Sequence, residues 1–151
     1  MRIGLIGAGR IGALHARTIT AHPEVTELVV ADADPMRAVE VAAALDATPV
    51  PSAAELFSLD IHAVVIASST ASHAGLIRAA AARGLPVFCE KPVALDLAGT
   101  REALRAADDA GTLLQVGFMR RFDAGYAAAR AAVRGGRLGR LHTVRALTSD
   151  P

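Results

Sequence analysis

The feature that most restricts how this chain can fold is a glycine pattern within its first twelve residues. A short apolar run over residues 3–6 leads directly into Gly7, Gly9 and Gly12, in the pattern G-x-G-x-x-G. In such a loop the first glycine permits a tight turn, the second lets a bound group approach the bare backbone, and the third lets a helix pack closely on the strand. The pattern therefore predicts a strand, a glycine loop and a helix.

The N-terminus of that helix is a predicted site for a diphosphate, because free backbone N–H groups and the helix dipole both attract anions there. A glycine pattern alone is weak evidence, since glycines also mark ordinary turns. The flanking strand and helix patterns strengthen it here. The candidate contacts are the loop residues Gly7, Ala8, Gly9, Arg10, Ile11 and Gly12.

An acidic residue follows at the distance that a dinucleotide site requires. Asp32 ends a second apolar run and lies 20 positions after Gly12. A carboxylate there accepts hydrogen bonds from the ribose hydroxyls on the adenine side and repels a 2′-phosphate, so the sequence predicts an NAD site. Because Ala33 follows Asp32, with no arginine directly after the carboxylate, we expect NAD to be preferred over NADP. Asp34 is better explained as a helix cap than as a second ribose ligand.

Further apolar runs alternate with segments of helical periodicity along the chain. They lie at residues 48–51, 63–67, 87–89 and 113–117. A continuously apolar run such as 63–67 is typical of a parallel strand that is covered on both faces. The predicted fold class is therefore α/β, with a doubly wound parallel sheet of the Rossmann type. In the first helix we expect Ile11, Leu14, Thr18 and Ile19 to face the sheet.

A polar cluster follows the apolar run over residues 63–67. It contains Ser68, Ser69, Ser72 and His73. In a doubly wound sheet the loops at the carboxyl ends of the strands face the ligand crevice, so we expect Ser68 and Ser69 to contact the cofactor's inner ribose and nicotinamide. The serines equally suit a helix cap, with Ser72 as a candidate, and the two roles are compatible. His73 fits a cofactor contact and an ordinary surface residue equally well.

The run over residues 87–89 brings Glu90, Lys91 and a proline to the same edge of the sheet. We expect Glu90 and Lys91 to lie beside the cofactor, with Lys91 as the candidate catalytic residue. A lysine fixed there can steer a substrate hydroxyl or assist its proton transfer. A solvated lysine at a strand end is the alternative that composition alone favours. Cys89 is most simply a small buried apolar residue.

The last quarter of the chain changes character. An aromatic and basic group that includes Met119 and Arg120 follows the last apolar run, and it indicates a ligand wall or, alternatively, a solvated helix start. From Leu141 to Thr148 apolar and polar residues roughly alternate, which predicts the first strand of an antiparallel sheet. We therefore expect an NAD-binding domain over residues 1–118. Residues 119–151 would hold a linking helix and the first strand of a truncated substrate or oligomerisation domain.

Composition argues against several other classes of function. The chain has 16 basic and 15 acidic residues, interspersed, with a formal net charge of +1, so we expect no nucleic-acid partner. No apolar run approaches the roughly 20 residues of a membrane helix. The N-terminus leads directly into a strand, so we also expect no targeting peptide. A single cysteine, Cys89, fits a reducing cytoplasm, and no residue spacing indicates a metal site.

Three segments resemble a known family. The glycine loop GAGRIG, the run VFCEKP and the run QVGFMRRFDAGY are similar to the glucose-fructose oxidoreductase / inositol dehydrogenase / rhizopine-catabolism family, and the last run most resembles inositol 2-dehydrogenases. The resemblance covers essentially the whole chain. It implies a Rossmann domain followed by a larger domain with an open antiparallel sheet, through which family members often form homo-oligomers. It also implies oxidation of a sugar or cyclitol hydroxyl, with hydride passing to a nicotinamide.

By the same resemblance, Lys91 is the lysine of the catalytic site, and Met119 and Arg120 contact the polyol. The acid/base histidine of such enzymes lies in the second domain, so we expect this chain alone to bind NAD but to be inactive. The alternative is a stand-alone nucleotide-binding or interaction module without catalysis, in which the strand over residues 141–148 pairs with a partner chain. A methyltransferase on the same sheet is disfavoured by the VFCEKP run and by the complete dinucleotide loop.

Overall fold

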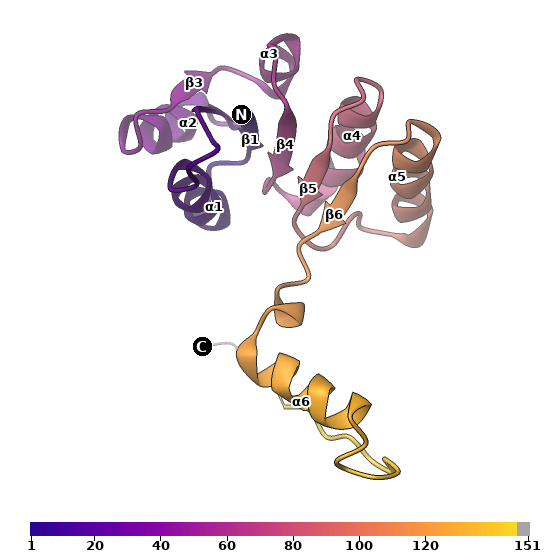
Figure 1. The fold of residues 1–151 in the computed structure, drawn as a ribbon. Helices are drawn as coiled ribbons and strands as arrows, with labels where there is room; N and C mark the ends of the chain where they lie inside the picture. Colours follow the sequence, from indigo (N-terminus) through magenta and orange to yellow (C-terminus); the bar gives the residue numbers. More distant parts are fainter. Residues whose placement is uncertain (148–151) are drawn as a thin grey trace. The chain divides into compact units, whose positions relative to one another are not determined.

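Residues 1–117 form a six-stranded sheet whose paired strands all run parallel, in the order β3-β2-β1-β4-β5-β6 (Figure 1). The computed structural model describes residues 1–147 of the chain. The strands are β1 (Arg2–Ile6), β2 (Glu27–Ala31), β3 (Thr48–Val50), β4 (Ala63–Ile66), β5 (Val87–Cys89) and β6 (Leu114–Val116). This order is that of a doubly wound Rossmann sheet, so the predicted fold class is confirmed.

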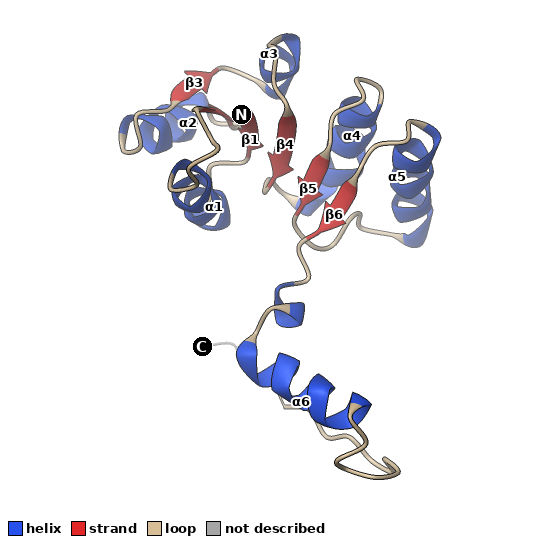
Figure 2. Ribbon diagram, viewed as in Figure 1, coloured by secondary structure: helices blue, strands red, loops and turns tan. Residues whose placement is uncertain are grey.

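Five helices connect these strands and cover the two faces of the sheet (Figure 2). Because side chains alternate along a strand, Ile3 and Leu5 of β1 belong to one apolar cluster and Ile6 belongs to the other. The first cluster includes residues of α1 and α2, and the second includes residues of α3, α4 and α5. The helices are α1 (Arg10–Thr20), α2 (Pro35–Ala43), α3 (Ala53–Ser58), α4 (Thr70–Ala81) and α5 (Leu97–Asp109).

The strand order reverses between β1 and β4, and this switch point fixes where a ligand can bind. β1 pairs with β2 on one side and with β4 on the other. The chain passes from β1 outward to β2 and β3, and then returns to form β4, β5 and β6 on the other side of β1. The loops at the carboxyl ends of the two central strands therefore diverge and leave a crevice between them. The glycine loop follows β1, and the serine cluster follows β4.

The expected inner face of the first helix is wrong in part. Ile11 is 37% exposed, Leu14 is 58% exposed and Thr18 is exposed as well. Gly12 and Ala16 are buried against the sheet instead. Ile19 is half-buried and packs on the cluster beneath α1, as expected. The helix approaches the sheet too closely for large side chains at its first two turns.

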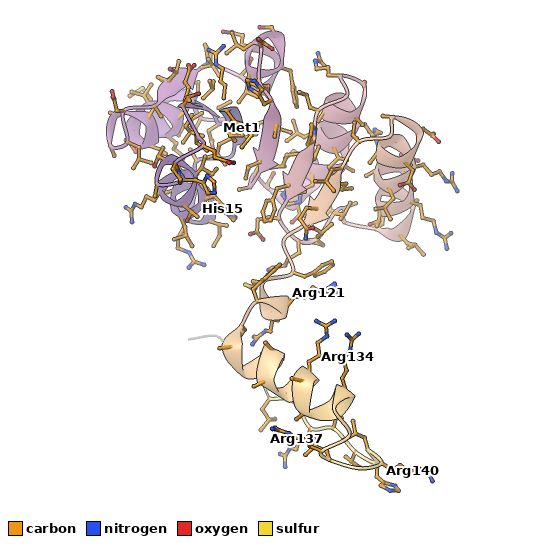
Figure 3. All side chains as sticks on the ribbon, viewed as in Figure 1. Met1, His15, Arg121, Arg134, Arg137 and Arg140 are labelled. Atoms are coloured by element: carbon orange, nitrogen blue, oxygen red, sulfur yellow. The ribbon has the colours of Figure 1, made fainter. Side chains whose placement is uncertain are left out.

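Residues from Phe118 onward form a separate unit, which contains the short 3₁₀ helix η1 (Met119–Arg121) and helix α6 (Ala124–Arg134). The Asp123 carboxylate accepts a hydrogen bond from the Tyr126 backbone N–H and so caps α6. Arg120 Nη1 donates to the Tyr126 hydroxyl over 3.1 Å, and its guanidinium lies 4.9 Å from the ring centroid. Exposed arginines that Figure 3 labels on this unit are Arg121, Arg134, Arg137 and Arg140.

The strand expected over residues 141–148 is not formed in residues 141–147, which have no regular secondary structure. Thr148 lies outside the described residues. An isolated segment has no partner strand to accept its backbone hydrogen bonds, so an alternating sequence alone does not make a strand.

Candidate functional site

A cleft opens at the switch point of the sheet, with a volume of about 660 Å³. It is bounded by the glycine loop, the end of β2, the start of α2, the segment before α3, and the loop between β4 and α4. Most of the predicted cofactor residues line it: Gly7, Gly9, Arg10, Ile11, Asp32, Ser68 and Ser69. Segments that are far apart in the sequence therefore meet at one place, as the strand order requires.

The chain itself requires glycine at two of the three positions in the loop. Gly7 has a φ of +105°, and an added Cβ would lie 2.4 Å from the backbone nitrogen of Ser68. An added Cβ on Gly12 would lie 1.8 Å from the Gly7 carbonyl oxygen. Gly7 therefore makes the turn and the contact with the β4 loop, and Gly12 lets α1 pack against the loop, as the sequence predicts.

Gly9 is different, because nothing in the described chain explains why it is glycine. Its φ of −70° and ψ of −172° are open to any residue, and an added Cβ would meet no atom within 4 Å. Gly9 lines the cleft. The space above it is therefore space that a bound group can use to approach the backbone.

Two helices begin in this cleft without a side-chain cap. Neither Gly9 before α1 nor Ser69 before α4 makes a side-chain capping hydrogen bond. The four other α-helices of the described chain are capped by the side chains of Asp34, Ser52, Asp96 and Asp123. The Ser72 N–H of α4 donates to the Ser69 carbonyl over 3.0 Å, so the N–H groups nearer the starts of the two helices are those left for an anion at the cleft. Ser72, the predicted cap candidate, donates instead to the Ser69 carbonyl over 2.8 Å.

Asp32 lies at the end of β2 and is fixed by two backbone N–H groups. Its Oδ2 accepts from Ala8 over 2.6 Å, and its Oδ1 accepts from Asp34 over 2.9 Å. The first bond ties the carboxylate to the glycine loop, so the predicted diphosphate and ribose contacts are held in one rigid arrangement. Ala8 is itself buried and contributes through this bond, not as part of the cleft wall. Asp34 caps α2, as predicted.

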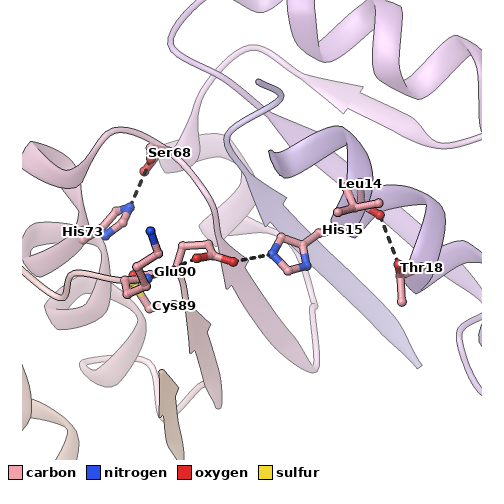
Figure 4. A network of polar contacts seen from close by, with 8 residues as sticks. Leu14, His15, Thr18, Ser68, His73, Cys89 and Glu90 are labelled. Atoms are coloured by element: carbon pink, nitrogen blue, oxygen red, sulfur yellow. Dashed lines mark hydrogen bonds and ion pairs between the residues drawn. The ribbon is translucent and has the colours of Figure 1, made fainter. Parts of the chain in front are cut away.

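The serine loop after β4 is held from behind by His73, which is only 1% exposed (Figure 4). Its Nδ1 lies 2.7 Å from the Pro92 carbonyl oxygen, and its Nε2 lies 3.1 Å from the Ser68 carbonyl oxygen. His73 therefore joins the loops that follow β4 and β5. It is neither a surface residue nor part of the cleft wall, so both sequence-based interpretations missed its burial. The Ser72 hydroxyl donates its proton to the Ser69 carbonyl oxygen. In the 2.7 Å contact between the Ser68 and Ser72 hydroxyls, Ser68 is therefore the donor and Ser72 the acceptor.

His15 is a contact that sequence reasoning missed. On α1, its Nε2 lies 2.9 Å from Glu90 Oε1 (Figure 4). Its ring packs edge-on against Phe88, with the ring centroids 5.2 Å apart. Both side chains of this hydrogen-bonded pair are largely buried. The pair joins the helix of the glycine loop to the end of β5. The sequence contains one indication of this contact: His15 lies three residues after Gly12 and so on the same face of α1.

Lys91 follows β5 and is exposed, and neither it nor Glu90 is part of the cleft wall. Glu90 Oε2 accepts a hydrogen bond from the Lys91 N–H over 3.2 Å, so one carboxylate orients both His15 and the backbone at Lys91. Cys89, just before, is fully buried, and its pKa is raised to about 12, first by burial and then by the charge of Glu90. Its thiol is therefore an apolar core group, as predicted.

Met119 and Arg120 belong to the second unit, and their assignment as substrate contacts stays a prediction. Among residues 1–147, no three or more His, Cys, Asp or Glu side chains are grouped so that they can hold a metal ion. Within the same residues no helix is both long and apolar enough to cross a membrane.

Residues 1–118 match the model of the GFO_IDH_MocA family, described as an oxidoreductase family with an NAD-binding Rossmann fold. The inositol 2-dehydrogenase of Rhizobium meliloti is 40% identical over 151 residues, which are all of this chain and 46% of that protein. The crystal structure of a myo-inositol dehydrogenase from Corynebacterium glutamicum has a TM-score of 0.83 at 42% identity. It matches 93% of this chain and 42% of its own.

A scyllo-inositol dehydrogenase from Lactobacillus casei was crystallised with NAD(H) and scyllo-inositol, and it has a TM-score of 0.85 at 30% identity. The match covers 92% of this chain and 42% of that one. The chain thus spans less than half the length of these relatives. The sheet order, the glycine loop and these likenesses agree: the chain belongs to the Gfo/Idh/MocA family of oxidoreductases and carries its NAD-binding Rossmann fold.

Proposed function

We propose that the cleft at the switch point binds NAD, and that the chain is the cofactor-binding part of an oxidoreductase that oxidises a cyclitol or sugar hydroxyl. The main support for a cofactor site here is that residue 9 is a glycine. Gly9 needs to be glycine neither for its backbone angles nor for packing within the described chain, and its missing side chain leaves the cleft open above the start of α1. A bound diphosphate supplies the reason for glycine there.

In this proposal the N–H groups at the start of α1, with Arg10 beside them, hold the diphosphate. Asp32 accepts the ribose hydroxyls on the adenine side, and Ser68 and Ser69 lie along the inner ribose. His73 acts on the cofactor indirectly, since it positions the Ser68 carbonyl and is itself buried. The bond between Asp32 and the loop supports this assignment, because it fixes the distance between the two ends of the site.

The bound nicotinamide supplies the hydride acceptor. Lys91, at the end of β5, is the residue that we propose to orient the substrate hydroxyl and to favour loss of its proton. Met119 and Arg120 contact the polyol, by the family resemblance. The names of the relatives, inositol 2-dehydrogenase and myo-inositol dehydrogenase, support a myo-inositol-like substrate. We also propose a cytoplasmic location, and homo-oligomers for a chain that includes the second domain.

The chain as it stands has no assigned acid/base group for the substrate. By the family resemblance the acid/base histidine lies in the second domain, and none of the five histidines of this chain matches it. Both ring nitrogens of His73 already contact carbonyl oxygens, so His73 in particular is not available as a general base. We therefore propose that this chain alone binds NAD without turning over a polyol. No observation favours the stand-alone interaction module over the cofactor-binding part of an oxidoreductase.

Isothermal titration of NAD into the native chain and into Gly9→Ala tests the cofactor site. We expect the native chain to bind NAD and the variant to bind it at least about tenfold more weakly, because the new methyl group occupies the approach to the backbone. Gly75→Ala is the matched control: Gly75 also has no atom within 4 Å of an added Cβ, but it is exposed on α4 and outside the cleft wall. Absence of NAD binding by the native chain overturns the proposal.

A further inference from the structure

We infer that Arg37 is a specificity-determining residue at the adenosine end of the cleft. Its guanidinium attracts a 2′-phosphate. Asp32 counteracts this attraction by repelling the phosphate, and Asp34 does so by partly neutralising Arg37. This inference rests on the proposed NAD site. It assigns the choice between NAD and NADP to three residues in place of the single carboxylate that the sequence indicates.

The first observation is the position of Arg37. It lies in the first turn of α2, five positions after Asp32, yet it lines the same cleft together with Asp32 and Ala33. The turn between β2 and α2 brings it back to the end of the strand. The residue directly after the carboxylate is Ala33, so a cation at this end of the site becomes evident only in the fold.

The second observation is the partner of Arg37 in the described chain. Its Nε lies 3.6 Å from Asp34 Oδ2, while Asp34 Oδ1 accepts from the Met36 N–H over 3.1 Å. The two side chains of this pair are 61% and 53% exposed, and pairs so exposed to solvent are weak. A phosphate group offers a guanidinium three acceptor oxygens and more charge than one carboxylate. Arg37 can therefore exchange Asp34 for a 2′-phosphate at little cost.

The third observation is that Asp32 cannot move away from the same phosphate. Both of its oxygens accept backbone N–H groups, from Ala8 at 2.6 Å and from Asp34 at 2.9 Å. A fixed carboxylate repels a 2′-phosphate, whereas Arg37, partly neutralised by Asp34, attracts it. In the native chain repulsion prevails and NAD is preferred. Removing the charge of Asp32 leaves the attraction of Arg37 unopposed.

The experiment measures the dissociation constants of NAD and NADP by titration for the native chain, Asp32→Asn, Arg37→Ala and the double variant. Asparagine removes the charge and keeps an acceptor oxygen for one of the two N–H groups, those of Ala8 and Asp34, that Asp32 binds. We expect Asp32→Asn to strengthen NADP binding about tenfold or more, and Arg37→Ala to reverse that gain in the double variant. NAD has no 2′-phosphate, so Arg37→Ala should change its affinity less than about threefold.

Arg10→Ala is the matched control, because Arg10 also lines the cleft but lies at the start of α1, by the diphosphate that both cofactors share. We expect it to weaken NAD and NADP equally. Asp34→Asn is a second test that keeps the cap on α2, since asparagine caps helices as well as aspartate. It should release Arg37 and strengthen NADP binding a few-fold, with NAD unchanged.

Gain of NADP binding in Asp32→Asn that survives removal of Arg37 overturns the inference, as does the absence of any gain in both Asp32→Asn and Asp34→Asn. Either result leaves the proposed NAD site intact, because the native chain still binds NAD. If the native chain binds neither dinucleotide, the proposed function itself fails and the inference fails with it.

Discussion

Cys89 shows how the sheet sets the chemistry of a single residue. The thiol is fully buried in β5, and its pKa is raised from 9.0 to about 12. A buried neutral thiol is not nucleophilic, because the reactive form is the thiolate. We expect iodoacetamide to leave Cys89 unmodified in the native chain at pH 8 and to alkylate it fully in denaturant, as mass spectrometry would show. Alkylation at equal rates in both states contradicts the buried position.

The same shift predicts a pH dependence of stability. Between pH 9 and pH 12 the unfolded chain loses the thiol proton while the folded chain keeps it, so the free energy of unfolding falls as the pH rises through this window. Below pH 9 the contribution is fully present. Urea titrations across the window, compared with Cys89→Ala, isolate the effect: the variant should lose less stability with pH than the native chain. Identical slopes would show that Cys89 does not contribute.

At the scale of single residues, the sequence predicts a residue's role best where only one or a few residue types can meet the structural requirement. Gly7, Gly12 and Asp32 lie as expected because a tight turn, a close approach and a strand-end carboxylate each admit few alternatives. His15 and Arg37 were missed, since their roles depend on partners that only the fold brings near. Histidine and arginine on a helix are usually surface residues, and nothing local marks the exceptions.

Among the elements, the helices illustrate what periodicity can and cannot predict. The cap at Asp34 follows from the sequence, because cap chemistry is local. The buried face of α1 does not follow, since large apolar residues seemed the natural choice there. Gly12 and Ala16 face the sheet instead, because the glycine loop requires this helix to lie close to it.

This difference makes a prediction for α1. Ala16 is fully buried and Leu14 is 58% exposed. Ala16→Leu should lower the free energy of unfolding by about 1–3 kcal/mol through overpacking. Leu14→Ala should change it by no more than about 0.5 kcal/mol, as expected of an exposed site. Chemical denaturation measures both, and the reverse order would mean that Leu14 faces the core, as its sequence pattern suggests.

For the molecule as a whole, the chain consists of two structural units. Residues 1–117 contain both apolar clusters and the cleft, whereas residues 118–147 hold Met119 and Arg120, which the family resemblance links to the substrate. The sequence predicts the Rossmann sheet because its strands are local apolar runs in a fixed order. It does not predict the end of the chain, since an alternating segment forms a strand only when a partner strand is present.

The whole chain is predicted to bind its cofactor without catalysis. Loss of a general base alone costs about 10² to 10⁴ in rate. We therefore expect no myo-inositol-dependent formation of NADH above background by this chain, under conditions in which it is saturated with NAD. The inositol 2-dehydrogenase of Rhizobium meliloti, a relative more than twice as long, is the positive control. NADH formation that Gly9→Ala abolishes would show that the acid/base group lies within this chain.

The central claim is that backbone N–H groups at the mouth of the cleft hold a dinucleotide diphosphate. Titration of NAD into the isotopically labelled chain, followed by amide NMR, tests it most directly. We expect the largest shifts on residues 7–12 at the start of α1, on Asp32, and on residues 69–72 at the start of α4. Shifts confined to other parts of the chain, or none at saturating NAD, would contradict it.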